Sequence, residues 1–333
     1  MSKSINWGLI GLGKMADVFI STLKEVPNSK VKGVASKSPQ RIKKISNNLS
    51  IDKKYCFNDY YDLIRCEEID IIYITLPNNL HFHIAQKALE NKKHVLVEKP
   101  ACLKSMEVMI LENLALTNKL IFAEGFAYLH NPMTKELLDI IDSGEIGSIL
   151  RISANIGFEI VPKVNIFSKL LDRFKKEHRL FNPEMGGGSI FDLGCYTLSF
   201  LQLITNLDNL QIIDKNLYNG FKKVDIDSKI EIQTNNNVRA YLHCSFIKTL
   251  DQLIKIRGTE GDIMIKGLWS GDDTAISVNN RIIHRSPKFD IPFSNQVHQI
   301  NNCIIEDNLI FENLLYSKFN SFNNIELIEL WRN

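Results

Sequence analysis

The chain has 333 residues, 44% hydrophobic and 23% charged, which is ordinary for a globular protein and favours two domains over one. Its 40 Lys and Arg and 38 Asp and Glu give a net charge of +2, which argues against nucleic acid or a membrane surface as partner. No stretch approaches the ~20 apolar residues that span a bilayer. Because a predicted strand begins almost at once, we expect no signal peptide and a cytoplasmic location.

The six cysteines are scattered, with no C-x-x-C pair and no Cys/His cluster at zinc spacing. We therefore expect reduced thiols and no metal site. Cys195 lies inside a motif discussed below, where we favour packing of a small residue over nucleophilic chemistry.

The first predicted strand runs from Ile5 into the turn Gly11-Leu12-Gly13-Lys14-Met15-Ala16, and helical character follows from Asp17 to Lys24. Strand, Gly-x-Gly-x-x-Ala turn and helix in this order are the fingerprint of dinucleotide binding. Gly11 permits the tight turn, Gly13 lets a pyrophosphate approach the backbone, and Ala16 lets the helix pack close to the strand. The start of the helix attracts the phosphate charge.

Strand and helix signals then alternate up to about residue 124. The strands are expected at Lys30–Ser36, Ile69–Leu76, His94–Glu98 and Leu120–Glu124, and the helices at Pro39–Leu49, Tyr60–Cys66, His81–Asn91 and Met106–Asn118. This rhythm predicts an α/β fold with a doubly wound parallel sheet and right-handed crossovers, which we assign to a dinucleotide-binding Rossmann domain over residues 1–122.

The pattern changes after a helix expected at Pro132–Ser143. Six alternating stretches suit a mainly antiparallel sheet: Ser148–Ile156, Leu210–Asn216, Lys229–Thr234, Ala240–Phe246, Gln252–Gly258 and Gly261–Lys266. We assign residues 123–333 to a domain for substrate binding and oligomerisation. A sheet covered by helices on one side leaves its other face to be buried, so we expect a homodimer or homotetramer.

The end of the second strand, Ala35-Ser36-Lys37, bears on the choice of cofactor. NAD-binding folds place an acidic residue about 20 positions after the glycines to hold the ribose hydroxyl. Here a hydroxyl at Ser36 is followed by Lys37, with Arg41 one turn further on. These groups suit a 2′-phosphate, which predicts NADP rather than NAD. The alternative is that Lys37 is a solvated surface charge.

Further motifs follow the strands expected at Ile69–Leu76 and His94–Glu98. Later in the chain, the glycine run 186–188 precedes a motif that contains Asp192 and Tyr196. Open α/β sheets bind ligands at the carboxyl ends of their strands. We therefore expect the cofactor site to include residues after those two strands, namely Leu76, Pro77, Asn78, His81, Glu98 and Lys99.

Over essentially its whole length the chain resembles the Gfo/Idh/MocA oxidoreductases. The resemblance rests on the glycine turn above and on five further segments: Glu98-Lys99-Pro100, Ser143-Gly144-Glu145-Ile146-Gly147, Gly186-Gly187-Gly188, Asp192-Leu193-Gly194-Cys195-Tyr196 and Gly258-Thr259-Glu260-Gly261. It implies a Rossmann domain, a C-terminal α/β domain with an open, mainly antiparallel sheet, and NAD(P)-dependent redox chemistry on sugars, inositols and related alcohols or carbonyls.

The resemblance also implies roles for individual residues. Lys99 corresponds to the lysine that acts on the substrate oxygen or positions it, and Pro100 is expected to follow a cis peptide bond. Pro77 and Asn78 would line the nicotinamide pocket, and His81 would lie near the nicotinamide ribose, unless it simply packs at the start of its helix.

Tyr196 departs from the family pattern, in which a histidine is common at this place. The departure resembles a branch with dimeric dihydrodiol dehydrogenases, NADP-linked xylose dehydrogenases and glucose–fructose oxidoreductase. We expect Lys99 and Tyr196 to share the proton role and Asp192, on the same helical face as Tyr196, to orient the substrate hydroxyl. The alternatives are that Asp192 caps a helix and that Tyr196 is a half-buried core phenol.

The main functional hypothesis is an NADP-dependent oxidoreductase acting on a sugar or polyol. One alternative is a redox-neutral sugar-modifying enzyme that transfers a hydride transiently and keeps its cofactor bound. Another is a non-catalytic regulator that binds a dinucleotide, which would not need Lys99, Asp192 and Tyr196. The identity of the substrate is not encoded in a recognisable pattern, because its pocket draws on loops such as Gly157–Leu180.

Overall fold

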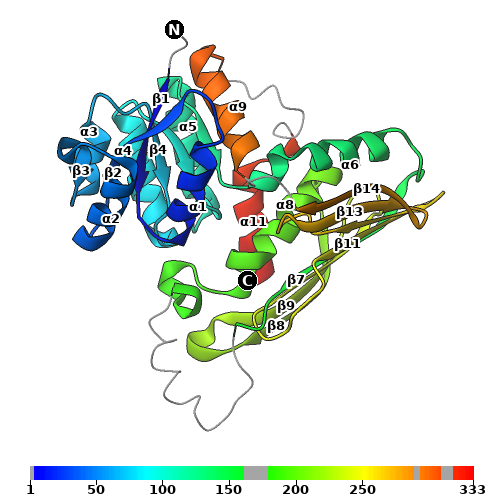
Figure 1. The fold of residues 1–333 in the computed structure, drawn as a ribbon. Coiled ribbons are helices and arrows are strands. Elements are labelled where there is room, and N and C mark those ends of the chain that lie inside the picture. Colours follow the sequence, from blue (N-terminus) through cyan, green and yellow to red (C-terminus); the bar gives the residue numbers. More distant parts are fainter. Residues whose placement is uncertain (1–3, 161–178, 289–292, 309–317) are drawn as a thin grey trace. The chain divides into compact units, whose positions relative to one another are not determined.

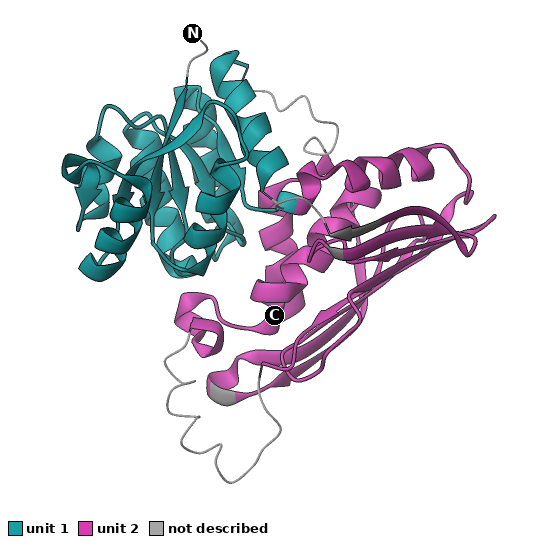
Figure 2. Ribbon diagram, viewed as in Figure 1, with its two compact units in different colours: residues 1–127, 291–314 teal, residues 128–290, 315–333 magenta. Residues whose placement is uncertain are grey.

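A computed structural model describes residues 4–160, 179–288, 293–308 and 318–333, and most of the loop expected at the substrate pocket lies outside these ranges. The chain forms two compact units (Figure 2). Unit 1 comprises residues 1–127 and 291–314, and unit 2 comprises residues 128–290 and 315–333. The chain therefore leaves unit 1 after residue 127, returns to it at residue 291 and leaves it again after residue 314, so the units do not follow the single boundary expected after residue 122.

Unit 1 is built on a parallel sheet of six strands in the order β3-β2-β1-β4-β5-β6, as expected for a doubly wound Rossmann fold (Figure 1). Its strands are β1 (Ile5–Ile10), β2 (Ser29–Ala35), β3 (Cys56–Phe57), β4 (Ile71–Ile74), β5 (His94–Val97) and β6 (Phe122–Glu124). Its helices are α1 (Lys14–Leu23), α2 (Pro39–Leu49), α3 (Tyr60–Arg65), α4 (His81–Glu90), α5 (Ser105–Asn118) and α9 (Ser294–Ile305), with short 3₁₀ turns η1 (Lys53–Tyr55) and η2 (Asn78–Leu80).

The central strands of unit 1 are buried because helices cover both faces of a doubly wound sheet. All four residues of β4 are inaccessible to solvent, which explains its unbroken β-branched and aromatic run. The core beside it is aromatic, with the ring of Phe19 5.0 Å from Trp7 and 4.1 Å from Tyr73 between centroids. The expected parallel sheet is confirmed.

Helix α9 completes unit 1 from a distant part of the sequence. The buried indole of Trp7 on β1 donates a hydrogen bond of 3.2 Å to Oδ1 of Asn301, whose amide also bonds Ser29. Gln296 donates to the backbone oxygen of Glu124 at 2.8 Å. These polar groups are buried or partly buried, so α9 supplies partners that residues 1–127 alone would lack.

Unit 2 holds a sheet of eight strands in the order β14-β13-β12-β11-β7-β10-β9-β8. Its strands are β7 (Ile149–Gly157), β8 (Gln211–Asn219), β9 (Asp225–Gln233), β10 (Arg239–Ser245), β11 (Leu253–Gly258), β12 (Asp262–Lys266), β13 (Asp272–Val278) and β14 (Arg281–Lys288). Its helices are α6 (Pro132–Asp142), α8 (Cys195–Ile204), α11 (Ser321–Arg332) and the π-helix η6 (Ile190–Gly194). Four 3₁₀ turns complete the description: η3 (Ala127–His130), which begins in unit 1, η4 (Arg179–Phe181), η5 (Pro183–Met185) and η7 (Phe221–Lys223).

The sheet is mainly antiparallel, as expected, with β7 and β10 as a parallel pair. Elements η6 and α8 pack on one face of the sheet and leave the other as an open face (Figure 1). Side chains along the strands alternate between these two faces. On β10, for example, Ala240, Leu242 and Cys244 are buried, whereas Arg239 is exposed and Tyr241 and His243 are half-buried. Strands β13 and β14, which extend the sheet beyond β12, are not predicted from the sequence.

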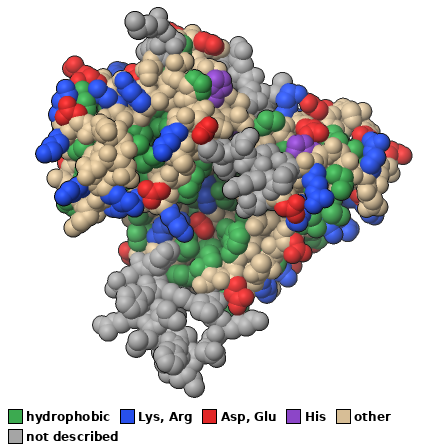
Figure 3. All heavy atoms as spheres, in the orientation of Figure 1, with side chains coloured by type: hydrophobic (Ala, Val, Ile, Leu, Met, Phe, Trp, Pro, Cys, Tyr) green, Lys and Arg blue, Asp and Glu red, His purple; other side chains and the backbone are tan. Residues whose placement is uncertain are grey.

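Charged side chains of both signs are interspersed on the visible face of the molecule, as the nearly balanced composition predicts (Figure 3). No helix in the described ranges is long and apolar enough to cross a membrane.

Candidate functional site

The glycine turn lies at the carboxyl end of β1. Gly11 has a φ of +85°, and a Cβ there would lie 2.7 Å from the backbone oxygen of Thr75, so both conformation and space require glycine. The hydroxyl of Thr75 donates to Gly11 O at 2.6 Å and ties the turn to the end of β4. At Gly13, which caps α1, a Cβ would meet nothing within 4 Å. That opening lets a ligand approach the backbone, and α1 begins without a side-chain cap on its N–H groups.

The other residues of the turn have separate positions. Ala16 is fully buried, as close packing of α1 requires. Lys14 is exposed and Met15 is half-buried, both in the first turn of α1.

Arg41 stabilises this turn, a role that differs from the expected contact with a 2′-phosphate. Its Nε donates to the backbone oxygen of Leu12 at 2.6 Å, and its Nη2 lies 2.8 Å from both carboxylate oxygens of Asp17. The guanidinium thus folds back from α2 over the glycine turn. The difference arises from Asp17 in the first turn of α1, which the sequence pattern does not identify as a partner of Arg41.

Ser36 and Lys37 follow β2 as expected. Ser36 is buried, and its hydroxyl accepts a hydrogen bond from the N–H of Ser38 at 3.2 Å. The ammonium of Lys37 lies 3.5 Å from Asp59 and 5.0 Å from the centroid of the Tyr60 ring. Its side chain is 66% exposed, so this ion pair is weak and accessible to a ligand.

His81 joins the loops that follow β4 and β5. Its ring is fully buried, with Nδ1 3.0 Å from the backbone oxygen of Pro100 and Nε2 2.8 Å from that of Leu76. Both partners are acceptors, so both contacts are hydrogen bonds only when both ring nitrogens carry hydrogen. The ring therefore has a structural position, and the expected contact with ribose is not what its geometry favours. Pro77 precedes η2, and Asn78, its first residue, is buried.

Hydrogen bonds from three other elements hold the turn that carries Lys99. Tyr73 donates its phenol hydrogen to the buried carboxylate of Glu98, His81 contacts Pro100 O, and the N–H of Ala101 donates to Glu124 Oε1 at 2.8 Å. The Lys99–Pro100 peptide is cis, which confirms the expectation from the family resemblance. Lys99 itself is half-buried. The residues on either side of Lys99 are thus held by groups from three neighbouring elements, through the Glu98 side chain and through the backbone of Pro100 and Ala101.

Unit 2 contains the glycine run and the residues that follow it. Gly186 and Gly188 have φ of +72° and +124°. A Cβ on Gly187 would lie 2.8 Å from backbone atoms of Asn182, and one on Gly188 only 2.2 Å from Asp225 Oδ1. The glycines are therefore required by close contacts within the protein, a reason that differs from the expected approach of a ligand.

Asp192 lies on the π-helix η6, which continues directly into α8. Its side chain is 16% exposed, and its Oδ1 is 3.5 Å from Nη2 of Arg179. No pattern in the sequence singles out Arg179. The π-helix is also unexpected, and such turns are frequent at functional sites.

Tyr196 occupies the first turn of α8 and is half-buried between two aromatic rings. Its ring centroid lies 6.3 Å from that of Tyr128 and 6.1 Å from that of Trp269, which follows β12. Tyr128 is held by a hydrogen bond of 2.8 Å between its phenol and Ser199. Trp269 is a further residue that sequence reasoning misses, because no local pattern links it to α8.

The six cysteines are free. Burial raises the pKa of the Cys244 thiol, which makes it a poor nucleophile. Among the described residues no group of three or more His, Cys, Asp or Glu side chains is placed to hold a metal ion.

Comparison with known proteins gives two family matches. Residues 5–126 match the oxidoreductase family with an NAD-binding Rossmann fold, and residues 134–264 match the GFO/IDH/MocA C-terminal domain. Trans-1,2-dihydrobenzene-1,2-diol dehydrogenase of Xenopus tropicalis is 26% identical over 299 residues, 89% of this chain and 84% of that protein. D-xylose 1-dehydrogenase (NADP(+)) of Hypocrea jecorina is 26% identical over 209 residues, 60% of this chain and 52% of that protein.

Among solved structures, KijD10, a 3-ketoreductase from Actinomadura kijaniata in complex with NADP and TDP-benzene, aligns with a TM-score of 0.83 at 21% identity. The alignment covers 99% of this chain and 97% of KijD10 and supports the same fold. With the two domain matches and the arrangement of unit 1, these findings show that the chain is an NAD(P)-dependent oxidoreductase of the Gfo/Idh/MocA family.

Proposed function

We propose that this protein catalyses NADP(H)-dependent redox chemistry between a hydroxyl-bearing carbon and the corresponding carbonyl of a sugar or polyol. When bound, the nicotinamide nucleotide supplies or accepts the hydride. The observation that carries the proposal is the turn at the end of β5, where Tyr73 bonds the side chain of Glu98 just before Lys99, and His81 and Glu124 bond the backbone just after it. The named relatives act on a diol and on xylose, which supports this substrate class.

The residues of unit 1 fit a dinucleotide. The open space at Gly13 and the uncapped start of α1, with Lys14, Met15 and Ala16, would hold the pyrophosphate. The loop that begins with Leu76, Pro77 and Asn78 and the turn at Glu98 would hold the nicotinamide end. His81 would act by joining these two loops, and Arg41 by bracing the glycine turn.

NADP is the preferred cofactor in this proposal. The segment Ser36-Lys37-Ser38 that ends β2 contains no acidic residue, and Ser36 and Lys37 offer a hydroxyl and an ammonium to a 2′-phosphate, which would compete with Asp59 for Lys37. KijD10 was crystallised with NADP, which supports the choice. Titrations of protein fluorescence with NADPH and NADH measure the two dissociation constants. We expect tighter NADPH binding, weakened in Lys37→Ala and unchanged in Lys43→Ala, an exposed lysine on α2. Tighter NADH binding, unaffected by Lys37→Ala, would reject the preference.

For the chemical step we assign the proton at the substrate oxygen to Lys99 and Tyr196, with Asp192 orienting the substrate hydroxyl. Arg179 is placed to orient Asp192 in turn. General acid–base groups typically contribute ~10²–10⁴-fold, so Lys99→Ala and Tyr196→Phe should each lower kcat/KM by a factor in that range. Lys43→Ala and Tyr218→Phe, at exposed positions, serve as controls.

The decisive experiment is a spectrophotometric screen at 340 nm with aldoses, uronic acids, nucleotide sugars and inositols, run with NADP⁺ and, for the corresponding carbonyl compounds, with NADPH. We expect turnover with at least one sugar or polyol, lost in the two active-site variants. Wild-type rates in both variants would remove the mechanism. Cofactor that stays bound through gel filtration, with sugar conversion but no net change in absorbance, would favour the redox-neutral alternative.

We also propose that the open face of the eight-stranded sheet contacts a second copy of the chain in a homodimer or homotetramer. That face carries a shallow depression of about 620 Å³ lined by Arg151, Tyr241, Lys255 and Met264, among others. Its apolar and charged groups of both signs suit a contact between identical surfaces. Light scattering should give a multiple of 38.1 kDa, reduced to one chain by Met264→Glu. A wild-type mass of a single chain at micromolar concentration would contradict this.

A further inference from the structure

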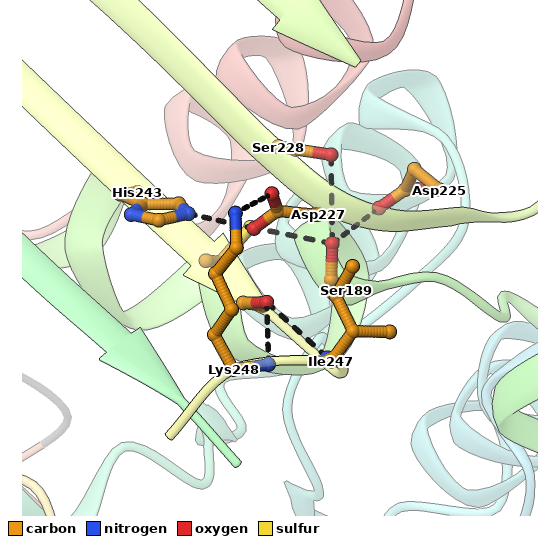
Figure 4. A network of polar contacts seen from close by, with 9 residues as sticks. Ser189, Asp225, Asp227, Ser228, His243, Ile247 and Lys248 are labelled. Atoms are coloured by element: carbon orange, nitrogen blue, oxygen red, sulfur yellow. Dashed lines mark hydrogen bonds and ion pairs between the residues drawn. The ribbon is translucent and has the colours of Figure 1, made fainter. Parts of the chain in front are cut away.

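The π-helix η6 begins without a cap of its own. Ser189, which precedes it, has a helical conformation and makes no side-chain cap hydrogen bond. Instead, the N–H of Ile190 donates to Oδ2 of Asp225 at 2.8 Å, and the hydroxyl of Ser189 donates to the same oxygen at 2.9 Å. Figure 4 shows Ser189 with dashed contacts to Asp225 and Ser228. A carboxylate from β9 therefore serves as the cap, and its negative charge suits the start of a helix.

The backbone encloses this carboxylate closely. Asp225 is 3% exposed, and its Oδ1 lies 2.2 Å from the position that a Cβ on Gly188 would take. With a φ of +124°, Gly188 also adopts a conformation that other residues rarely occupy. The glycine run and Asp225 thus form one contact, which explains why the run must be glycine just before η6.

The C-terminal helix holds the same π-helix from another side. Nε of Arg332 lies 3.7 Å from Oδ1 of Asp225, and its guanidinium carbon lies 4.6 Å from the ring centroid of Phe191 on η6. A Cβ on Gly194, at the end of η6, would lie 3.0 Å from the Trp331 ring. The charge of Arg332 also compensates a buried carboxylate that would otherwise be costly.

We propose that Asp225 and Arg332 are positioning residues, which hold η6 so that Asp192 on it and Tyr196 just after it are presented to the substrate. The inference rests on the proposed function of Asp192 and Tyr196. Neither positioning residue is assigned a contact with substrate or cofactor. Their effect passes through the backbone of η6, where a displacement of about 1 Å can cost ~10²-fold in rate.

The first test needs no substrate and follows amide hydrogen exchange in peptides spanning residues 186–196. Asp225→Asn keeps the size of the side chain but removes its charge. Because hydrogen bonds to charged groups are strong, losing the charge should weaken the attachment of η6 to β9. Amide exchange in η6 should therefore accelerate by roughly 10–100-fold. Peptides of unit 1 should be unchanged. The matched control is Asp227→Asn on the same strand, because Asp227 bonds His243 and Lys248 (Figure 4), whereas Asp225 bonds the start of η6.

The second test is kinetic and uses NADP⁺ with the sugar that reacts fastest in the screen. Asp225→Asn and Arg332→Gln should lower kcat about 10–100-fold, with the dissociation constant of NADPH within about twofold of wild type. Asp227→Asn should keep the wild-type kcat. If Asp225 acts through Asp192, adding Asp225→Asn to an Asp192→Asn variant should lower kcat little further. If Asp225→Asn instead causes a general loss of structure, the double variant should lose kcat by the full factor of the Asp225→Asn single variant as well.

The outcomes separate the two proposals. Wild-type rates in Asp192→Asn and Tyr196→Phe overturn the proposed function, and the role of Asp225 with it. Slow Asp192 and Tyr196 variants beside a fully active Asp225→Asn overturn the positioning role alone. Unchanged exchange in η6 overturns it as well. Should an Asp225 variant not fold, Arg332→Gln carries both tests, since it removes the charge partner at the surface end of the network.

Discussion

Replacing His81 by alanine removes the ring that joins the loops after β4 and β5. The backbone oxygens of Leu76 and Pro100 lose contacts of 2.8 and 3.0 Å in a site with no exposure to solvent. Leaving even one of these buried oxygens without a partner costs about 1–3 kcal/mol, and removing the buried ring also costs packing, so we expect a total loss of about 2–4 kcal/mol. The same change frees the turn that presents Lys99.

Two measurements follow from this. Thermal unfolding should shift down by at least about 4 °C, given about 2–4 °C per kcal/mol for a domain of this size. In the assay established by the sugar screen, kcat/KM should fall by about tenfold or more, because the position of Lys99 is no longer fixed. His83→Ala is the control, since His83 is exposed two residues further along the same helix.

Conservative variants at this position sharpen the test. The amide of asparagine places a donor near the position of Nδ1, and that of glutamine near Nε2, so each should restore one of the two contacts. We expect intermediate stability for both. An alanine variant within about 0.5 kcal/mol of wild type, the range of ordinary surface substitutions, would refute the structural role assigned to this ring.

Three further predictions concern other parts of the molecule. Gly11→Ala should abolish NADPH binding in a fluorescence titration, because φ is +85° and the new Cβ would lie 2.7 Å from a backbone oxygen, while the exposed Gly13→Ala should weaken binding without loss of stability. Arg41→Ala should weaken NADPH and NADH alike, since Arg41 braces the turn, whereas Lys37→Ala should weaken NADPH alone; equal effects of both variants on the two nucleotides would contradict the division of roles. For Asp227, burial alone would raise the pKa, but hydrogen bonds from Lys248, His243 and Ser245 outweigh it and leave that pKa below its ordinary value. The carboxylate therefore stabilises the fold above pH ~4, the ordinary value for aspartate, and this contribution is lost as the pH falls through the lowered pKa. Unfolding midpoints of wild type and Asp227→Asn should thus differ at pH 7 and converge below pH ~4, and a constant difference down to pH 2 would contradict the assignment.

Local signals were sufficient for most of unit 1. Helix α2 begins at Pro39 and ends at Leu49, as predicted, because Ser38 caps it, proline suits its first turn and Ser50 leaves it in a left-handed conformation. The central strands β4 and β5 are buried almost throughout, and β4 carries an unbroken apolar run. Where the spacing of apolar residues agrees with the capping residues at both ends, the sequence is sufficient to predict the helix or strand.

The features that the sequence analysis misses depend on distant partners. Strand β14, at the edge of the sheet, has no clear alternation of buried and exposed residues. Strand β13 does alternate, and Asn279 and Asn280, both at positive φ, are a recognisable turn signal between the two strands. The partner of Arg41 is a carboxylate 24 residues away in the sequence, and the cap of η6 is 35 residues away. No spacing rule connects such pairs, so Arg179, Trp269 and Asp225 become visible only in three dimensions.

The return of α9 to unit 1 has a consequence for synthesis on the ribosome. Residues 1–127 emerge first, yet the partners of Trp7 and Ser29 on α9 are translated only after all the strands of unit 2. During synthesis, residues 1–127 must therefore remain without the contacts that α9 provides until nearly the whole polypeptide has been made. A fragment that stops at residue 127 should accordingly be prone to aggregation, and supplying residues 293–308 in trans or by circular permutation should restore its solubility.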